Sequence, residues 1–310
     1  MYFENFSEKN YIIKSLHKNG LSVIKKILDK ETVLTIKKKA SRYLNQPRLL
    51  KTISDIKAAK NYKISSKPHW LPKKFWNKND IFEFKQPTGL INKKLSKNII
   101  KKGYKYYSNF TNSVEFKDPL INFPEISKIV FNENVVQIAK NFLKTNPYLG
   151  YVALRCHFNN NLPTNDFNLF HTDDRIKTTN PKNRILKILV PFHSVYKGQI
   201  EIRQNILNKK KFGSKEFYKL QYSKFSELPR KLKKLLIRPK VFSGDAYFFD
   251  PDNFFHNADK PKKLRIMLYI TFAKKENYML FKTRKIKIKK TFFENLSTSQ
   301  KSFGRYLNLV

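Results

Sequence analysis

The spacing of apolar residues changes from a helical to a strand period about halfway along the chain. In residues 31–44 and 134–144, apolar side chains recur every three or four positions, which is the spacing of one helix face. From residue 151 onward they alternate with polar residues, most clearly over residues 151–158 (YVALRCHF). Alternation at every second position is typical of a strand with one buried face. The pattern therefore predicts two helices before the strands begin.

Several more short apolar runs follow in the second half, separated by turn-forming residues. We predict strands at residues 185–192, 199–203, 246–249 and 264–272, and a helical insert at 225–236. Gly244 and Asp245 predict a turn that leads into the third of these strands. Many short strands with turns between them are typical of a β-barrel or sandwich. We expect a mainly β fold whose outer surface is braced by the flanking helices.

The chain reads as a single domain over residues 1–310, because it has no repeat and no long Gly/Ser or Pro linker. Residues 1–150 form a helical and irregular flanking part, 151–275 the strand-rich core, and 276–310 a basic C-terminal extension. Within the first part, residues 57–122 are rich in lysine and interrupted by prolines. We expect this stretch to be irregular and to pack over the core through its aromatic residues.

The charge is strongly positive, with 64 Lys+Arg against 23 Asp+Glu and a formal net charge of +41. Such a charge attracts nucleic acid or anionic membranes. However, only 11 of the basic residues are arginine, the residue that a nucleic-acid surface uses for bidentate contacts. We therefore attribute the charge mainly to a compositional bias toward lysine, and nucleic acid is a less favoured partner. The densest basic run, residues 282–290, is expected to be an exposed edge strand or a solvated tail.

Other features exclude some classes of protein. The single cysteine, Cys156, can form neither an internal disulfide nor a thiolate cluster, so a bound metal would need histidine and carboxylate ligands. The longest apolar runs, such as residues 266–273, are about half the ~20 residues that cross a bilayer. The N-terminus lacks the apolar core of a secretory signal. We expect no membrane span and a cytoplasmic location.

One set of residues points to metal chemistry. His171 and Asp173 are two positions apart, so on an extended strand both side chains lie on one face. A closed barrel could bring His256 beside them. Two imidazoles and one carboxylate are the ligand set of non-haem Fe(II) oxygenases. Arg265, at the start of the last strong strand, could bind a carboxylate through two hydrogen bonds.

This order of H-x-D, Gly-Asp turn, distal histidine and arginine resembles the phytanoyl-CoA dioxygenase family of Fe(II)- and 2-oxoglutarate-dependent oxygenases. Residues 17–44 also resemble the opening segment of that family, in which a strand precedes a helix. The resemblance implies a double-stranded β-helix core, also called a jelly-roll or cupin-like fold, over residues 151–275.

The resemblance also implies roles for individual residues. His171, Asp173 and His256 would be the catalytic iron ligands, and Arg265 would bind the distal carboxylate of 2-oxoglutarate. The remaining candidates for contact with cosubstrate or substrate are two residues that share one face of the strand before H-x-D, namely Arg155 and His157.

The implied activity is that of an oxidoreductase that hydroxylates a small-molecule or lipid-like substrate with dioxygen and releases succinate and carbon dioxide. Asp173 favours hydroxylation, because related halogenases lack this carboxylate. Phe170, Tyr247 and Phe249 are candidates for the walls of the site, although aromatic residues on barrel strands more often belong to the core.

Three alternatives remain open at this point. The chain could be a basic β-barrel that binds a polyanion, with its histidines incidental, or an oxygenase that modifies nucleic acid. It could also be a cupin-like metal protein that uses no keto acid. An Arg265 side chain directed away from the metal would favour that last reading.

Overall fold

The computed structural model describes residues 2–3, 8–52, 113–159, 185–192, 202–205, 230–234, 236–237, 241–258, 261, 263–274 and 286–310. Their elements are, in chain order, β1 (Tyr2–Phe3), α1 (Lys9–Asn19), β2 (Leu21–Ile24), α2 (Lys30–Tyr43), η2 (Pro47–Leu49), β3 (Leu50–Thr52), β4 (Ser113–Phe116), α5 (Pro119–Asn122), η5 (Pro124–Ile126), α6 (Ser127–Val130), α7 (Glu133–Leu143), β5 (Tyr148–His157), β6 (Ile185–Pro191), β7 (Ile202–Asn205), α9 (Arg230–Lys234), β8 (Leu236–Ile237), β9 (Ala246–Phe249), β10 (Phe255–Ala258), β11 (Arg265–Ala273), β12 (Lys287–Ile288), α11 (Lys290–Glu294), α12 (Thr298–Phe303) and β13 (Asn308–Leu309). None of the helices in these ranges is long and apolar enough to cross a membrane.

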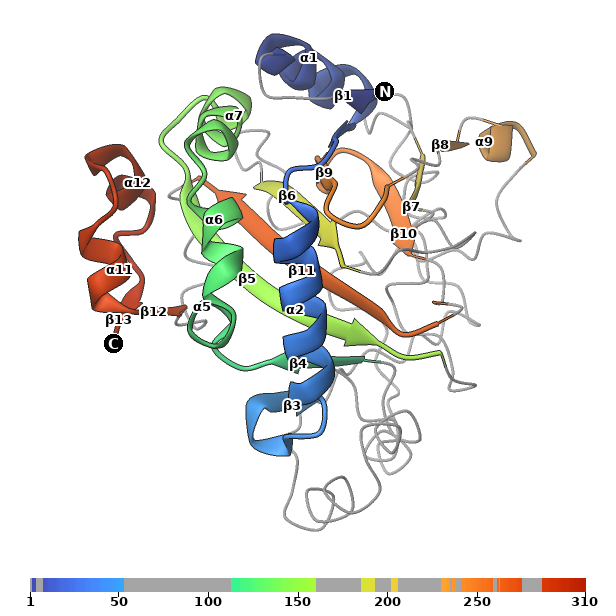
Figure 1. Ribbon diagram of the computed structural model, residues 1–310. Coiled ribbons are helices and arrows are strands. Elements are labelled where there is room, and N and C mark those ends of the chain that lie inside the picture. Colours follow the sequence, from blue (N-terminus) through green and yellow to red (C-terminus); the bar gives the residue numbers. More distant parts are fainter. Residues whose placement is uncertain are drawn as a thin grey trace, which may run out of the picture.

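The strands form a large sheet, a small sheet and a short C-terminal pair (Figure 1). The large sheet has the order β1-β2-β9-β6-β11-β5-β4-β3, and its strands are antiparallel except for the parallel pair β1 and β2. The small sheet has the antiparallel order β10-β7-β8. The expected mainly β fold with flanking helices is therefore confirmed.

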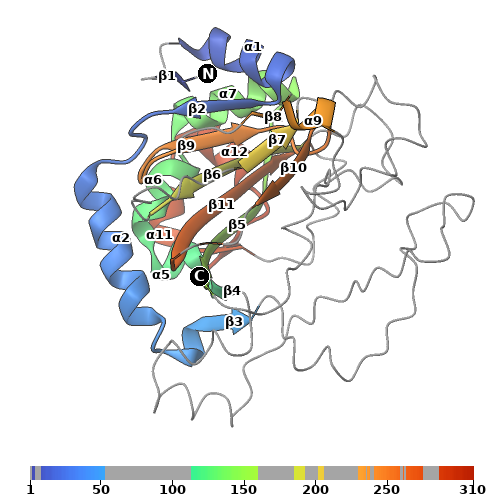
Figure 2. The ribbon, with the colours of Figure 1, turned by 90° about the vertical axis from the view of Figure 1, so that its right-hand side faces the viewer.

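The two faces of the large sheet pack against different partners. One face carries Val152, Leu154 and Cys156 of β5 and joins the main apolar core with the buried residues of α2 and α7. Figures 1 and 2 show α2, α5, α6 and α7 on this side of the sheet. The opposite face, which we call the inner face, holds a smaller apolar cluster made of Leu21, Val23, Leu189, Val241, Tyr247, Phe249 and Met267. Among the described helices, α2, α5, α6 and α7 therefore brace one face of the sheet, in agreement with the expectation of bracing helices.

The two helices expected from periodicity are present, and each begins at a side-chain cap. Asp29 accepts a hydrogen bond from the backbone N–H of Thr32 at the start of α2, and Asn132 caps α7 in the same way. Such caps satisfy backbone N–H groups that have no partner inside the helix. The periodicity therefore located both helices to within one residue, and a short polar residue caps the first turn of each.

Most of the expected strands are also confirmed. β6, β9 and β11 match their predicted ranges to within one residue, and β5 begins three residues before the predicted start. Within the predicted 199–203 strand, residues 199–201 lie outside the described residues, and β7 continues to Asn205. The predicted helical insert contains α9, but its end is wrong, because Leu236 pairs with Asn205 as part of β8. Cross-strand hydrogen bonds override the helical pattern there.

The prediction of an irregular stretch over residues 57–122 is wrong at its end. Residues 57–112 lie outside the described residues, but β4 and α5 occupy the remainder. In β4, Val114 and Phe116 are buried in the main core while Glu115 lies on the opposite face. Pro119 stands at the start of α5, where a proline loses no helical hydrogen bond. A proline at this first position is therefore compatible with a helix.

The described C-terminal residues pack on the helical side of the sheet. Of the basic run, Lys287 and Ile288 form β12, which pairs with β13, and Ile288 is buried in the main core. Phe303 of α12 joins the same core. The prediction of a strand is therefore confirmed for residues 287–288. The expected exposure is wrong for Ile288, which is buried.

Two tight turns bring the N-terminal part onto the inner strands. Gly244 has φ +87° and makes the predicted turn before β9, and Asp245 caps it by accepting from the backbone N–H of Phe242. Gly20 ends α1 with φ +73°, and a Cβ at this position would lie only 2.3 Å from the ring of Phe254. Because Phe254 is two residues before His256, this contact helps to set the position of β10.

Replacing Gly20 with alanine is expected to lower the free energy of unfolding by about 2–5 kcal/mol. The left-handed backbone costs about 1–2 kcal/mol for a residue with a Cβ, and forcing a methyl group against a packed ring costs about 1–3 kcal/mol. Denaturant unfolding would measure the change, with Lys14→Ala, an exposed position on the same helix, as control. An unchanged midpoint for Gly20→Ala would show that the Phe254 contact is loose.

Candidate active site

Only part of the predicted metal site can be located. His171, Asp173 and Phe170 lie outside the described residues. His256 lies on β10, in the small sheet, opposite Gln204 of β7. Within the described ranges, no three His, Cys, Asp or Glu side chains come close enough to hold a metal ion. Of the three predicted ligands, only His256 is among the described residues.

His256 is buried and is oriented by its own strand. Its Nδ1 lies 3.2 Å from the backbone carbonyl oxygen of Phe254, and its ring meets the ring of Phe249 edge-on, with centroids 5.1 Å apart. Because a carbonyl oxygen only accepts, this hydrogen bond requires the proton on Nδ1 and leaves the lone pair of the neutral ring on Nε2. Metal-binding histidines commonly have this arrangement. The residue therefore fits the role of a metal ligand.

Arg265 also faces the space between the two sheets. It is the first residue of β11, where Ile266 and Leu268 point to the main core and Met267 joins the cluster on the inner face. Side chains alternate along a strand, so Arg265 lies on the inner face with Met267. Because Phe249 of the same face contacts His256 of the small sheet, the inner face is packed against the small sheet. His256 and Arg265 thus both lie between the two sheets.

A buried polar cluster surrounds Arg265 on the inner face. Arg265 lies directly opposite His157 across the β11–β5 pair, and Arg155 lies opposite Glu115 across the β5–β4 pair. Directly opposite residues on one face have neighbouring side chains. The two candidates Arg155 and His157 are therefore brought next to Arg265 by strand register.

The anionic partner of Arg155 is a residue of this chain. Its Nε donates to Oε2 of Glu115 at 3.1 Å, and the hydroxyl of Tyr151 donates to the same oxygen at 2.5 Å. Arg155 also donates to the Tyr151 hydroxyl and lies over the ring of Tyr269, 4.8 Å from its centroid. Burying an ion pair is tolerated when additional hydrogen bonds satisfy both groups, as here. Arg155 is thus held in place whether or not a ligand is bound.

His157 is a neutral hydrogen-bonding group. Its Nε2 lies 2.8 Å from the hydroxyl of Tyr269. Burial, together with the positive charges of Arg265 and Arg155, holds the pKa of His157 well below its usual range. Burial also raises the pKa of Tyr269, an effect that the two arginines partly oppose. Both members of the pair are therefore uncharged near neutral pH.

Three members of this cluster were not recognised from the sequence, namely Glu115, Tyr151 and Tyr269. The signal for Glu115 is its alternation with Val114 and Phe116, which places a carboxylate on the inner face. The aromatic candidates Tyr247 and Phe249 are part of the apolar cluster on that face, stacked with centroids 5.2 Å apart. Asp245 has the turn-capping role expected for it.

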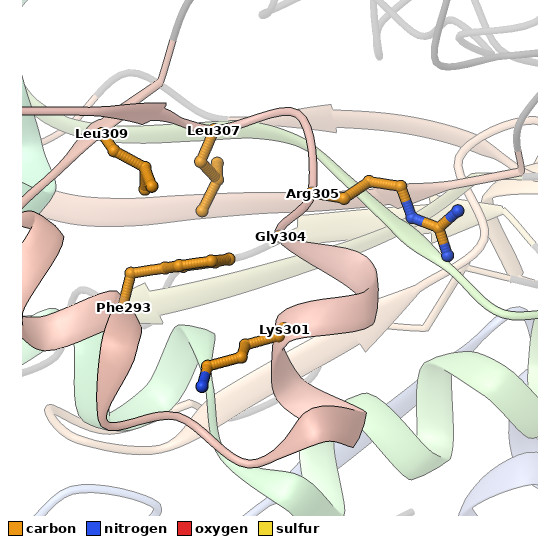
Figure 3. Close-up of a pocket in the computed structure, with 6 residues that line it drawn as sticks. All are labelled: Phe293, Lys301, Gly304, Arg305, Leu307 and Leu309. Carbon is orange, nitrogen blue, oxygen red and sulfur yellow. The ribbon is translucent and has the colours of Figure 1, made fainter.

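The described residues also form a hollow away from this cluster (Figure 3). It has a volume of about 350 Å³ and is lined by Phe293, Lys301, Gly304, Arg305, Leu307 and Leu309. These residues belong to the C-terminal segment, whose helix α12 contacts α7 and β5 and buries Phe303 in the main core. The hollow therefore belongs to the helical side and not to the inner face.

The comparison with known proteins gives a fold but no family. No protein-family model and no curated protein matches the chain. The structure is similar to that of the epimerase SnoN in complex with Fe3+, alpha ketoglutarate and nogalamycin RO, with a TM-score of 0.50 and 9% identity over 87% of this chain and 84% of that one. At this identity the likeness shows a shared fold.

Two further solved structures are similar at a lower level. One is the non-heme alpha ketoglutarate dependent epimerase SnoN from nogalamycin biosynthesis, with a TM-score of 0.45 and 11% identity over 86% of this chain and 83% of that one. The other is AviO1 from Streptomyces viridochromogenes Tue57, with a TM-score of 0.44 and 11% identity over 86% of this chain and 95% of that one.

Replacing His157 with glutamine is expected to make the stability less sensitive to acid. Because the folded-state pKa lies well below the ordinary 6.5, the unfolded chain takes up a proton below pH 6.5 that the folded protein does not. The wild type should therefore lose about 1.4 kcal/mol per pH unit from His157 alone as the pH falls from about 6.5 toward the folded-state pKa. Glutamine cannot titrate and removes this loss. Denaturant unfolding at about pH 7.5 and 5.5 measures it, and the same pH dependence in both proteins would contradict a neutral, buried His157.

Proposed function

We propose that this protein is an Fe(II)- and 2-oxoglutarate-dependent oxygenase that hydroxylates a small-molecule or lipid-like substrate. The observation that carries the proposal is the placement of His256 and Arg265. These buried residues of successive strands both lie between the two sheets. His256 has the tautomer of a metal ligand, and Arg265 has a guanidinium suited to a carboxylate.

We also propose that the two sheets form the double-stranded β-helix that the sequence resemblance implies. Along the chain, β6 lies in the large sheet, β7 and β8 in the small one, β9 in the large, β10 in the small and β11 in the large. Such alternation between two antiparallel sheets is characteristic of a jelly roll. The likeness to the SnoN fold supports this assignment.

The strand directions support a position beside the small sheet for the H-x-D segment, which contains His171 and Asp173. β5 and β6 are both antiparallel to β11, so they run parallel to each other. β5 ends opposite Arg265, the first residue of β11, whereas β6 begins opposite Ala273, the last one. β5 thus ends and β6 begins at opposite ends of β11. Among the described strands, β10 has a neighbour on one side only. We propose that the connection runs beside β10 and brings His171 and Asp173 next to His256.

In this proposal, each residue has a defined task. His171, Asp173 and the Nε2 atom of His256 would hold Fe(II), and Arg265 would bind the distal carboxylate of 2-oxoglutarate. Phe249 and Tyr247 would exclude water from the space around His256. When bound, iron and 2-oxoglutarate together supply the oxidation, in which dioxygen converts the keto acid to succinate and carbon dioxide and the substrate is hydroxylated.

The likeness to the fold of SnoN supports iron and 2-oxoglutarate as the cofactors. It also adds epimerisation to the reactions to be considered. SnoN is an epimerase crystallised with Fe3+ and alpha ketoglutarate, so a related fold binds both groups. An epimerase has a different outcome from a hydroxylase, and our preference for hydroxylation rests on Asp173. The orientation of Arg265 toward the interior favours a keto-acid-dependent enzyme over a metal protein without one.

Anaerobic addition of Fe(II) and then 2-oxoglutarate should produce the weak visible charge-transfer band of a keto acid chelated to ferrous iron. His171→Ala and His256→Ala should abolish the band, because each removes a ligand. Arg265→Ala should keep the band but require about 10- to 100-fold more 2-oxoglutarate, since one charge-assisted hydrogen-bonding group is lost. His17→Ala is the matched control, because its ring stacks on Phe142 on the helical side.

The other candidate functions have different outcomes in the same experiment. Folded, iron-loaded protein without a band would exclude the cosubstrate and favour a metal protein that uses no keto acid. Failure to bind iron, combined with salt-sensitive binding of nucleic acid, would favour the polyanion-binding module.

A further inference from the structure

The pair formed by His157 and Tyr269 lies where a bound carboxylate would meet Arg265. Register places His157 directly opposite Arg265, and the Tyr269 hydroxyl lies 2.8 Å from Nε2 of His157. Tyr269 itself is four residues further along β11, so its side chain extends back along the strand toward Arg265. The positive charge of Arg265 contributes to the lowered pKa of His157 and partly offsets the rise that burial gives to the pKa of Tyr269. An imidazole, a phenol and a guanidinium therefore converge on one part of the inner face.

The hydrogen bond between His157 and Tyr269 can be made in two directions. In one, the phenol donates to an unprotonated Nε2. In the other, Nε2–H donates to the phenol oxygen, and the phenol proton is then available to a further acceptor. A carboxylate at Arg265 is such an acceptor, so its binding selects the second direction. Because His157 is neutral, it can supply the donor without adding a third positive charge beside Arg265 and Arg155.

The ring of Tyr269 is held independently of any ligand. The guanidinium of Arg155 lies 4.8 Å from the ring centroid, and Glu115 and Tyr151 hold Arg155. This contact leaves the phenol little freedom to swing away from His157, since a cation over an aromatic face is an attractive and directional contact. The cluster around Arg155 thus presents the Tyr269 hydroxyl in one place.

We propose that Tyr269 and His157 complete, with Arg265, a subsite selective for the distal carboxylate of the keto acid, in which His157 Nε2–H donates to Tyr269 and Tyr269 donates to the carboxylate. This inference rests on the proposed function, in which Arg265 binds that carboxylate. Tyr269 touches the cosubstrate, whereas His157 acts through Tyr269 and is a positioning residue. The pair adds discrimination between keto acids to the anchoring that Arg265 provides.

The test compares 2-oxoglutarate with 2-oxopentanoate, a keto acid of the same length without the distal carboxylate. Both are titrated anaerobically into Fe(II)-loaded protein, and the charge-transfer band gives the dissociation constants. Tyr269→Phe should weaken 2-oxoglutarate binding about 10- to 100-fold and leave 2-oxopentanoate unchanged, because only the carboxylate uses the hydroxyl. Tyr148→Phe, a buried tyrosine at the far end of β5, is the matched control and should change neither constant.

Substitutions of His157 test the direction of the hydrogen bond. Glutamine carries an N–H donor, so His157→Gln should retain most of the preference for 2-oxoglutarate, whereas His157→Leu should lose it as Tyr269→Phe does. A second readout needs neither iron nor activity. In protein labelled with ¹⁵N-histidine, the resonance that disappears in His157→Gln should be that of a neutral ring near neutral pH, and it should shift to the Nε2–H form when 2-oxoglutarate is added.

The outcomes separate this inference from the proposed function. A wild-type band together with unchanged discrimination in Tyr269→Phe overturns the inference and leaves the oxygenase intact. An equal loss of affinity for both keto acids also overturns it, because it would indicate a purely structural role. No band in the wild type overturns the proposed function itself, and the subsite with it.

Discussion

The pairing of β11 with β5 is the interaction on which the rest of the structure depends. It joins the two longest described strands in the middle of the large sheet, from Arg265 opposite His157 to Ala273 opposite Tyr148. A shift of one residue in this register would move every side chain of one strand to the other face. Apolar residues such as Leu154 and Leu268, buried in the main core, oppose such a shift. The same register that buries the core therefore sets the polar residues opposite one another on the inner face.

The inner face shows how a protein can keep several ionisable groups in a buried space. Two arginines and a histidine would repel one another if all were charged. Glu115 compensates Arg155 at 3.1 Å, and His157 remains neutral because burial and its arginine neighbours disfavour its protonation. Buried charges are tolerated when they are paired and hydrogen-bonded. A carboxylate bound at Arg265 would extend this arrangement and would not require the face to reorganise.

Much of the fold could be predicted from local patterns in the sequence. The alternation in β5 correctly separated its core face from its polar face, and the spacing of apolar residues correctly located α2 and α7. These features depend on neighbours within a few residues, which periodicity describes directly. The errors occurred where the local signal was weak or misleading, namely at β4, at α5, which begins with Pro119, and at β8. The residues of β8 are in a strand because β7 lies beside them.

The sequence by itself determined which residue types were available for the site and in what order along the chain, including His256 and Arg265. The tertiary structure decided which of them meet. Glu115 precedes Arg155 by 40 positions and Tyr269 follows His157 by 112, and no spacing rule within one strand relates residues so far apart. Their contacts arise from strand order and register in the large sheet, which depend on how the whole apolar core packs. For this reason, the pairing of Arg155 with Glu115 and the uncharged state of His157 could be derived only from the folded structure.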